Sequence, residues 1–357
     1  NLDRYFYCSC EVPISHSTSI FAKPKNEQKN MKIFVTGADG LLGNNMVRLL
    51  LDKGYSVKVF IQTGKDLGYL KGLNIEVSHG DLLNYEELHQ AMEGADVVIN
   101  AAAVTDTWPN KGGLYWKVNV DGVRNVVNAV KSLQIKRLVH VGTANSFGPG
   151  DASNPGTELN PFDGEKYGLD YITSKYKAQE MILKECRENK LPALIVNPTF
   201  MIGPYDVKPS SGKMIISVIQ GKVPGYSPGG RNFVYVKDVA QAIVNSVEKG
   251  RVGECYLAAG VNLTYKDMFA KIANIFEVKP PTLGIPGFAV LIYGGILSMI
   301  GKITKKEQVI SYPLALISNE FHYYSNAKAV EELDMPKTDI EFAIKEAVAW
   351  FKEEKYL

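Results

Sequence analysis

The sequence predicts an α/β protein in which one parallel sheet carries helices on both faces. From Met31 onward, short apolar runs alternate with longer segments whose apolar residues recur at helical spacing. The run at 97–101 is almost wholly apolar, as expected for a strand that is covered on both sides. Strict alternation of strand and helix requires crossover connections, so the sheet is predicted to be parallel and doubly wound.

The same patterns place the individual elements. Strands are predicted at 32–36, 56–61, 75–79, 97–101, 137–141 and 193–197, and helices at 41–53, 85–92, 118–133 and 171–186. After Pro198 the alternation loosens, and Gly, Pro and Ser gather between 203 and 230. Helical stretches return at 214–220, 237–248 and 265–276, which indicates a smaller second unit.

Composition narrows the function classes. The 357 residues carry a formal net charge of +2, which gives no electrostatic footprint for nucleic acid. The four cysteines (Cys8, Cys10, Cys186 and Cys255) have no histidine cluster beside them, so we expect free thiols, no metal site and a cytoplasmic location. Residues 1–30 lack both periodicity and the pattern of a secretory signal, and Met31 is a candidate natural start.

A glycine-rich loop joins the first predicted strand to the first predicted helix. Its glycines are Gly37, Gly40 and Gly43, and Leu41 and Leu42 lie between the last two. Glycine allows a tight turn and lets a pyrophosphate approach the backbone, and the following helix presents unpaired N–H groups to the phosphates. This context predicts a dinucleotide site on a Rossmann sheet; the alternative is a glycine turn without a ligand.

The ends of neighbouring strands supply further candidates for the cofactor site. Asp81, followed by Leu82, ends the third strand, where its carboxylate can accept from an adenine amino group or simply cap the next helix. Small side chains after the fourth strand leave room for ribose and pyrophosphate: Ala101, Ala102 and Ala103.

The residue after the second strand bears on the choice of cofactor. An acidic side chain there would bind the ribose 2′-hydroxyl of NAD, whereas arginine would suit the 2′-phosphate of NADP. This chain has Gln62, with Lys65 just beyond. The absence of the acid favours NADP over NAD.

Tyr171 and Lys175 form the candidate catalytic pair. Residues four apart share a helix face, and a lysine ammonium near a phenol stabilises the phenolate. Tyr171 is therefore a candidate general acid/base, and Lys175 can also hold the nicotinamide ribose. A hydroxyl at the end of the preceding strand would orient the substrate oxygen: Thr143 is our first choice and Ser146 the fallback.

One apolar segment invites comparison with a membrane helix. Residues 281–301 carry no charged side chain and reach the length of a spanning helix. The segment also contains Pro281, Pro286 and several glycines. We expect a buried helix of the second unit rather than a membrane-facing one, and no membrane span.

Together these motifs resemble the extended short-chain dehydrogenase/reductase family, of the NAD-dependent epimerase/dehydratase type, from Met31 nearly to the C-terminus. The loop at 36–43 resembles its T-G-x-x-G-x-x-G motif. The other matching stretches are Asp81 in G-D-L, 119–122 in N-V-x-G, the set Thr143, Tyr171 and Lys175, and the segments 197–198, 203–204 and 233–239. Within the family the likeness is strongest to dihydroflavonol reductase-like and hopanoid-associated sugar epimerase-like proteins, through 208–213 and 253–256.

The resemblance implies a domain organisation and further site residues. It implies an NAD(P)-binding Rossmann domain at 31–200 and a mainly substrate-binding domain at 201–357, with about 232–252 returning to the first; 1–30 are a tail, tag or upstream segment. It also implies that Pro198 borders the nicotinamide, and that homodimers form through a four-helix contact. Two residues depart from the family pattern: Thr143 replaces a serine, and Gln62 replaces the arginine of the reductases.

Three residues are candidates for binding the small-molecule substrate: Trp108, Asn145 and Arg231. Arg231 falls where UDP-galactose epimerase-like enzymes place an arginine that grips the sugar-nucleotide diphosphate. The alternative is a surface salt-bridge arginine. Trp108 and the apolar run at 285–300 would suit a hydrophobic or aromatic substrate.

Three functions follow from these observations. The first is a carbonyl reductase or alcohol dehydrogenase in which Tyr171 donates the proton, Lys175 tunes Tyr171 and Thr143 polarises the carbonyl. The second is a nucleotide-sugar epimerase or dehydratase with tightly held NAD, which Arg231 favours. The third is a module that senses the NADP/NADPH ratio without turnover, because a fold does not fix a function.

Overall fold

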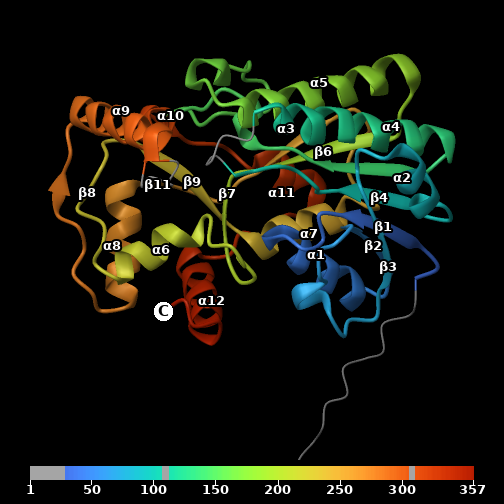
Figure 1. The fold of residues 1–357 in the computed structure, drawn as a ribbon, viewed down its shortest axis with the longest axis horizontal. Helices are drawn as coiled ribbons and strands as arrows, with labels where there is room; N and C mark the ends of the chain where they lie inside the picture. The colour runs from blue at the N-terminus through green and yellow to red at the C-terminus, as the bar shows by residue number, and fades with distance from the viewer. Residues whose placement is uncertain (1–28, 107–111, 305–309) are drawn as a thin grey trace, which may run out of the picture.

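The computed structural model describes residues 29–106, 112–304 and 310–357, and its centre is a seven-stranded sheet (Figure 1). The strands are β1 (Lys32–Thr36), β2 (Ser56–Gln62), β3 (Glu76–Gly80), β4 (Val97–Asn100), β5 (Arg137–Val141), β6 (Ala193–Pro198) and β10 (Cys255–Ala258). Their order is β10-β6-β5-β4-β1-β2-β3, and every pair is parallel. The predicted doubly wound sheet is confirmed, and β10 adds a strand that the pattern did not reveal.

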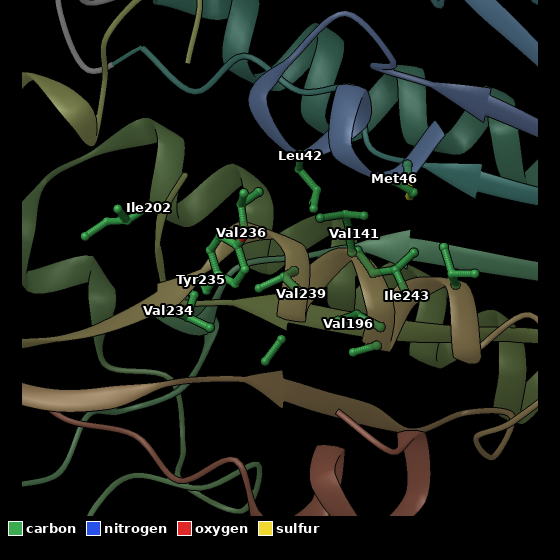
Figure 2. Packing of buried hydrophobic residues seen from close by; sticks show 14 of the residues in the cluster. Leu42, Met46, Val141, Val196, Ile202, Val234, Tyr235, Val236, Val239 and Ile243 are labelled. Carbon is green, nitrogen blue, oxygen red and sulfur yellow. The ribbon is translucent and has the colours of Figure 1, made fainter. Parts of the chain in front are cut away.

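Helices cover both faces of this sheet because its strands are apolar on both sides. Ile33 and Val35 of β1 pack with α1 (Leu41–Asp52) and α7 (Val236–Asn245), and Figure 2 shows Leu42, Met46, Val239 and Ile243 in this layer. Phe34 points to the opposite face, where it joins the core formed with α2 (Tyr85–Met92), α4 (Val123–Ser132) and α5 (Asp170–Asn189). Neighbouring residues of one strand therefore serve two separate cores.

The helix predicted at 118–133 differs from the observed structure. The segment forms α3 (Gly113–Trp116), a π-helical stretch η2 (Lys117–Gly122) and then α4. Apolar periodicity cannot distinguish a π-helical stretch from an α-helix over six residues. Such π-helical insertions are frequent at functional sites.

A second, four-stranded sheet is built by the loosely patterned C-terminal part. Its strands are β7 (Phe200–Ile202), β9 (Gly230–Tyr235), β11 (Val261–Thr264) and β13 (Phe321–His322). β9 pairs antiparallel with β11 and parallel with β7 and β13. The same part of the chain also forms the short pair β8 (Gly225–Tyr226) and β12 (Leu283–Gly284) and the helices α6 (Gly212–Ile219), α8 (Tyr265–Ile275), α11 (Ala327–Leu333) and α12 (Ile340–Glu353). A 3-10 turn, η1 (Gly68–Leu70), follows β2 in the first part of the chain.

The segment predicted to return to the first domain, about 232–252, contains α7, which packs on α1. β10, which extends the main sheet, lies just beyond it. The division into domains stays a prediction. The segment 1–28 lies outside the described residues, whereas Lys29 already bonds to Tyr55 and Glu248 of the folded body.

The apolar segment near 281–301 forms α9 (Gly287–Thr304), and the expectation that this helix is buried is wrong. Only 17% of it is buried, and Phe288 and Ile303 are 70% and 80% exposed. By length and composition α9 could cross a membrane. An apolar composition is the same for a helix packed inside a protein and for a helix on its surface, so composition alone could not predict that α9 is exposed. α10 (Tyr312–Ser318) packs beside α9 at the same edge of the molecule (Figure 1).

The close packing of the glycine loop yields a stability prediction. A Cβ on Gly43 would lie 2.1 Å from the carbonyl oxygen of Gly37, which is backbone and cannot move aside. We expect Gly43→Ala to lower the free energy of unfolding by about 1–3 kcal/mol, measured by urea denaturation. Gly113→Ala is the control, because a Cβ there meets nothing within 4 Å. Equal denaturation midpoints for the two variants would contradict this account.

Candidate functional site

The three glycines of the loop are glycine for different structural reasons, because the space beside their Cα atoms differs. Gly37 has a φ of +69°, and a Cβ there would lie 2.6 Å from the backbone of Ala101 and Ala102. Gly37 and Gly43 are therefore required by the packing of the chain against itself. A Cβ on Gly40 would meet only one atom, at 3.6 Å. The fold does not require glycine at position 40, so the open space there is available to a ligand.

The space beside Gly40 faces the first turn of α1. Gly40 caps the helix without a side-chain bond, and the first turn carries no acidic residue. The N–H groups of Leu41, Leu42 and Gly43 have no intrahelical acceptors, as at any helix start. Free donors at the positive end of a helix suit a phosphate. The observed loop therefore fits the pyrophosphate of a dinucleotide.

A buried chain of polar side chains lies beneath the loop. Thr36 donates from its hydroxyl to Asn100 Oδ1 at 2.6 Å and accepts from the Ala102 amide at 3.2 Å. Asn100 Nδ2 lies 3.1 Å from Nδ1 of His140. Burial, reinforced by the charge of Lys175, lowers the pKa of His140 well below its usual value, so the ring is neutral and accepts this bond. The chain fixes the ends of β1, β4 and β5 relative to one another.

Sequence reasoning missed this network. The available signal was a single polar residue inside an otherwise apolar strand, as at Asn100 and His140. Such a residue is buried only when it has a partner, so its presence points to a partner on an adjacent strand.

The remaining cofactor candidates lie along the same edge of the sheet. Gln62 is exposed at the end of β2, Leu82 is buried after β3, and Pro198 is buried at the end of β6. The three alanines, Ala101, Ala102 and Ala103, are partly buried after β4. The Lys65 ammonium lies 3.1 Å from the carboxylate of Asp39 in the glycine loop.

Asp81 is exposed, and the alternative that it caps the next helix is wrong. The N-cap of α2 is Asn84, whose side chain accepts from the Glu87 amide. The Asp81 carboxylate instead accepts from the Leu83 amide at 2.9 Å, within its own turn. Its role toward a cofactor stays a prediction.

The candidate catalytic side chains converge beyond the end of β5. Lys175, on α5, is 3% exposed and donates to the carbonyl oxygen of Val141 at 2.6 Å. Burial lowers the pKa of Lys175 to about 8. Tyr171 lies one turn earlier on the same helix. Burial raises its pKa, whereas a hydrogen bond from Thr143 and the charge of Arg231 act in the opposite direction.

Two buried amides hold this group in place. Asn119, in the π-helical stretch η2, donates to the hydroxyl of Ser174 at 3.0 Å and exchanges two hydrogen bonds with the backbone of Val104. Asn197, at the end of β6, donates to the carbonyl oxygen of Thr143 at 3.0 Å and to Gln179 of α5 at 2.8 Å. Each amide ties α5 to the end of a strand, so both position the helix that carries Tyr171 and Lys175.

Two glycines near these amides, Gly142 and Gly122, leave room for the side chains that pack against them. A Cβ on Gly142 would lie 2.3 Å from the Asn197 amide nitrogen. A Cβ on Gly122 would lie 2.7 Å from the Leu82 side chain. The N-V-x-G motif is thus explained by packing: its asparagine joins Val104, in the segment after β4, to Ser174 of α5, and its glycine leaves room for Leu82.

Of the candidate substrate residues, the structure describes Arg231 and Asn145 but not Trp108. Arg231, on β9, has its guanidinium 4.7 Å from the ring centre of Phe200 and pairs with no carboxylate among the described residues. The alternative of a surface salt-bridge arginine is therefore wrong. Asn145 is partly buried in the 3-10 turn η3 (Ala144–Ser146), and its amide donates to the Thr143 hydroxyl at 3.3 Å. Trp108 lies outside the described residues, and the fallback Ser146 is buried.

The buried ammonium gives a prediction on stability. Its folded pKa of about 8 is below the unfolded 10.5, so the unfolded chain binds more protons within this window and stability rises with pH across it. We expect the free energy of unfolding of Lys175→Met at neutral pH to exceed that of the parent by up to about 3 kcal/mol. The variant should also lose the rise in stability between pH 8 and 10.5. Chemical denaturation across the window measures both.

Lys177→Met, an exposed position on the same helix, is the control and should change stability by less than about 0.5 kcal/mol. A Lys175→Met variant that is less stable than the parent at neutral pH would contradict a destabilising buried charge.

Comparison with known proteins places this site in a family. The model of the NAD dependent epimerase/dehydratase family matches residues 33–259. A putative dihydroflavonol 4-reductase of Synechocystis sp. is 28% identical over 329 residues, which cover 91% of this chain and 95% of that protein. Sterol demethylase protein B of Methylococcus capsulatus is 29% identical over 331 residues, covering 90% of this chain and 99% of that protein.

A solved structure agrees with these sequence matches. The crystal structure of gox2253 superposes with a TM-score of 0.81 at 28% identity, covering 91% of this chain and 99% of that chain. The family match extends over more than half of the sequence and includes the glycine loop, Thr143, Tyr171 and Lys175. The chain belongs to the NAD dependent epimerase/dehydratase family, within the extended short-chain dehydrogenases/reductases, and is an NAD(P)-dependent enzyme.

Proposed function

We propose that this enzyme is a reductase or dehydrogenase that acts on a ketone or a secondary alcohol, with Tyr171 as its general acid and base. The observation that carries the proposal is the arrangement at the end of β5. There Tyr171, Thr143 and Lys175 lie on the edge of the sheet that also bears the glycine loop. Ligands of open parallel sheets bind at this carboxyl edge.

Each side chain has a part that follows from its surroundings. A nicotinamide dinucleotide held at this edge would supply the hydride chemistry at the substrate carbon. Burial raises the pKa of Tyr171, so the phenol is protonated at neutral pH and can give its proton to the substrate oxygen. Thr143, whose hydroxyl faces the phenol, orients that oxygen. Lys175 would hold the ribose. Among the described groups, Thr143 and Arg231 rather than Lys175 lower the free energy of the phenolate that remains.

The substrate is proposed to combine an apolar body with a polar or anionic group. Tyr171 packs against an apolar cluster of Tyr167, Ile172 and Ile317, against which Leu314 and Leu316 of α10 also pack. Arg231 supplies a positive charge near the same phenol and has no carboxylate partner in the described part of the chain. The name of one relative refers to a sterol, which fits an apolar body.

The cofactor is proposed to be NADP. Gln62 stands at the end of β2 and carries no charge that would repel a 2′-phosphate. Lys65 lies close by, and its bond to Asp39 joins two exposed or half-exposed side chains, so the ammonium can turn to a phosphate at small cost. We propose Lys65 as the residue that distinguishes the two cofactors.

The second candidate is a nucleotide-sugar epimerase or dehydratase. Arg231 favours it, because an unpaired guanidinium suits a diphosphate. Such an enzyme recycles its cofactor and keeps it bound, whereas a reductase must exchange it. The homodimer and the cytoplasmic location stay predictions.

The role of Tyr171 as general acid can be tested with Tyr171→Phe, which removes the phenolic oxygen and keeps the ring. Turnover is followed as NADPH oxidation with a panel of alicyclic and aromatic ketones. We expect Tyr171→Phe to lower kcat by about 10²–10⁴-fold, because the general acid is lost, while the Kd for NADPH is unchanged. Tyr176→Phe is the matched control: it lies on the same helix, and its ring stacks on Phe162. If Tyr171→Phe keeps the parental kcat, Tyr171 is not the acid.

Cofactor choice can be tested by calorimetric titration with NADPH and NADH. We expect the parent to bind NADPH more tightly. Lys65→Ala should weaken NADPH binding by about fivefold and leave NADH binding unchanged, because only NADPH carries the 2′-phosphate. Equal losses for both cofactors would remove Lys65 from this role. NAD released from the purified protein on denaturation would instead favour the epimerase.

A further inference from the structure

The helix α9 exposes an apolar surface that the other described residues, 29–106, 112–304 and 310–357, do not cover. We define the α9 face as Phe288, Ile292, Ile296, Met299 and Ile303. These side chains are all more than half exposed, and their spacing of three or four residues places them on one side of the helix. Tyr293 and Ile300 are also exposed, so the helix is apolar beyond that side. A helix that is apolar all round is normally enclosed by protein or by lipid.

The helix is fixed against the body along its length. At its N-terminal end, Asn319 donates to the carbonyl oxygen of Gly287 at 2.9 Å. In the middle, Gly294 lets the backbones of α9 and α10 approach closely, because a Cβ there would lie 2.7 Å from the Cβ of Ala315. Farther along, the Tyr312 amide donates to Ser298 at 2.8 Å. α9 therefore lies flat on the molecule and presents its outer side, as Figure 1 shows at the edge of the fold.

A positive charge lies at the C-terminal end of this surface. Lys302, in the last turn of α9, is exposed, and residues 280–301 carry no charged side chain. A lysine at the end of an apolar helix suits an anionic headgroup, because its stem can lie along apolar surface while the ammonium stays at the polar boundary. The α9 of a second copy would offer Lys302 no opposite charge, because this helix contains no acidic residue.

We propose that α9 docks this enzyme on the surface of an anionic lipid bilayer. The α9 face enters the boundary between headgroups and acyl chains, and Lys302 contacts a phosphate. Because α9 is held flat against α10, it lies in the membrane surface rather than crossing the bilayer.

The docking surface is one helix away from the reacting phenol. Ile317 of α10 is buried in one cluster with Tyr167 and Ile172, and Tyr171 packs against the same cluster, while α9 packs on α10. α10 therefore contacts both α9 and the cluster beside the phenol. Docking through α9 would bring this side of the site to the bilayer. Resting on the function proposed above, the substrate is then a ketone or alcohol that dissolves in the membrane and enters along α10.

Vesicle flotation of the full chain tests docking without any assumption about catalysis. We expect binding to vesicles of phosphatidylcholine and phosphatidylglycerol. Phe288→Glu/Met299→Glu should reduce the bound fraction at least about tenfold, because charge enters the apolar boundary. Leu159→Glu/Val252→Glu is the matched control: it places the same charges at exposed apolar positions elsewhere and should leave binding unchanged. All variants should bind NADPH as the parent does, which shows that they are folded.

The charge of Lys302 can be tested separately. Lys302→Gln should weaken binding to the anionic vesicles by about fivefold and leave the weaker binding to pure phosphatidylcholine vesicles unchanged. Equal losses on both vesicle types would overturn the role of the charge.

The substrate class has its own readout. On vesicles that contain a long-chain ketone, Phe288→Glu/Met299→Glu should lower the rate of NADPH oxidation, whereas the rate with a short, water-soluble ketone should match the parent. Equal rates of parent and variant on both ketones would overturn entry from the membrane.

The outcomes separate the two proposals. Absence of vesicle binding by the parent overturns docking. So does a parental dimer that Phe288→Glu/Met299→Glu converts to a monomer without any vesicle binding, since a second copy then covers α9. If the vesicles bind but Tyr171→Phe keeps its turnover, docking stands and the proposed function fails. If Tyr171→Phe is inactive but no vesicles bind, the function stands and docking fails.

Discussion

The close approach of the glycine loop to the chain beyond β4 is the contact on which the rest of the site depends. Gly37 packs against the backbone of Ala101 and Ala102 at a separation that no side chain could share. This contact brings the start of α1 to the carboxyl edge of the sheet. The network of Thr36, Asn100 and His140 then holds the adjoining strand ends at fixed spacing. A pyrophosphate site and a catalytic helix can therefore face each other across one edge.

The catalytic side of the site is positioned through α5 at a cost in stability. Lys175 is buried and donates to one backbone carbonyl, that of Val141, and the low pKa of its ammonium reports the unfavourable burial of a positive charge. Asn119 of η2 and Asn197 of β6 bind α5 from two different elements and hold the helix where that burial occurs. Strain of this kind is common where a reaction needs a group in a fixed place. The amides are thus as necessary to the arrangement as the residues that react.

The C-terminal part adds two features that the Rossmann sheet alone lacks. β9 carries Arg231 to the neighbourhood of Tyr171, with the guanidinium over Phe200 rather than beside a carboxylate. α10 contributes Ile317 to the apolar cluster against which Tyr171 packs, and it also packs on α9. Substrate recognition and the exposed apolar surface are therefore connected through one short helix, although the sequence places them far from the catalytic residues.

Local signals were enough to predict the parallel sheet, the glycine loop and the pair on α5: apolar periodicity, glycine spacing and residues one helical turn apart. Features that depend on contacts between distant segments emerged only from the folded chain. These are β10 and the second sheet, whose strands pair with segments far away in the sequence, and the partners of Asn100, His140, Asn119 and Asn197. The folded chain also leaves α9 exposed. An apolar segment has the same composition whether protein covers it or not, and only the packing of the remaining chain distinguishes the two.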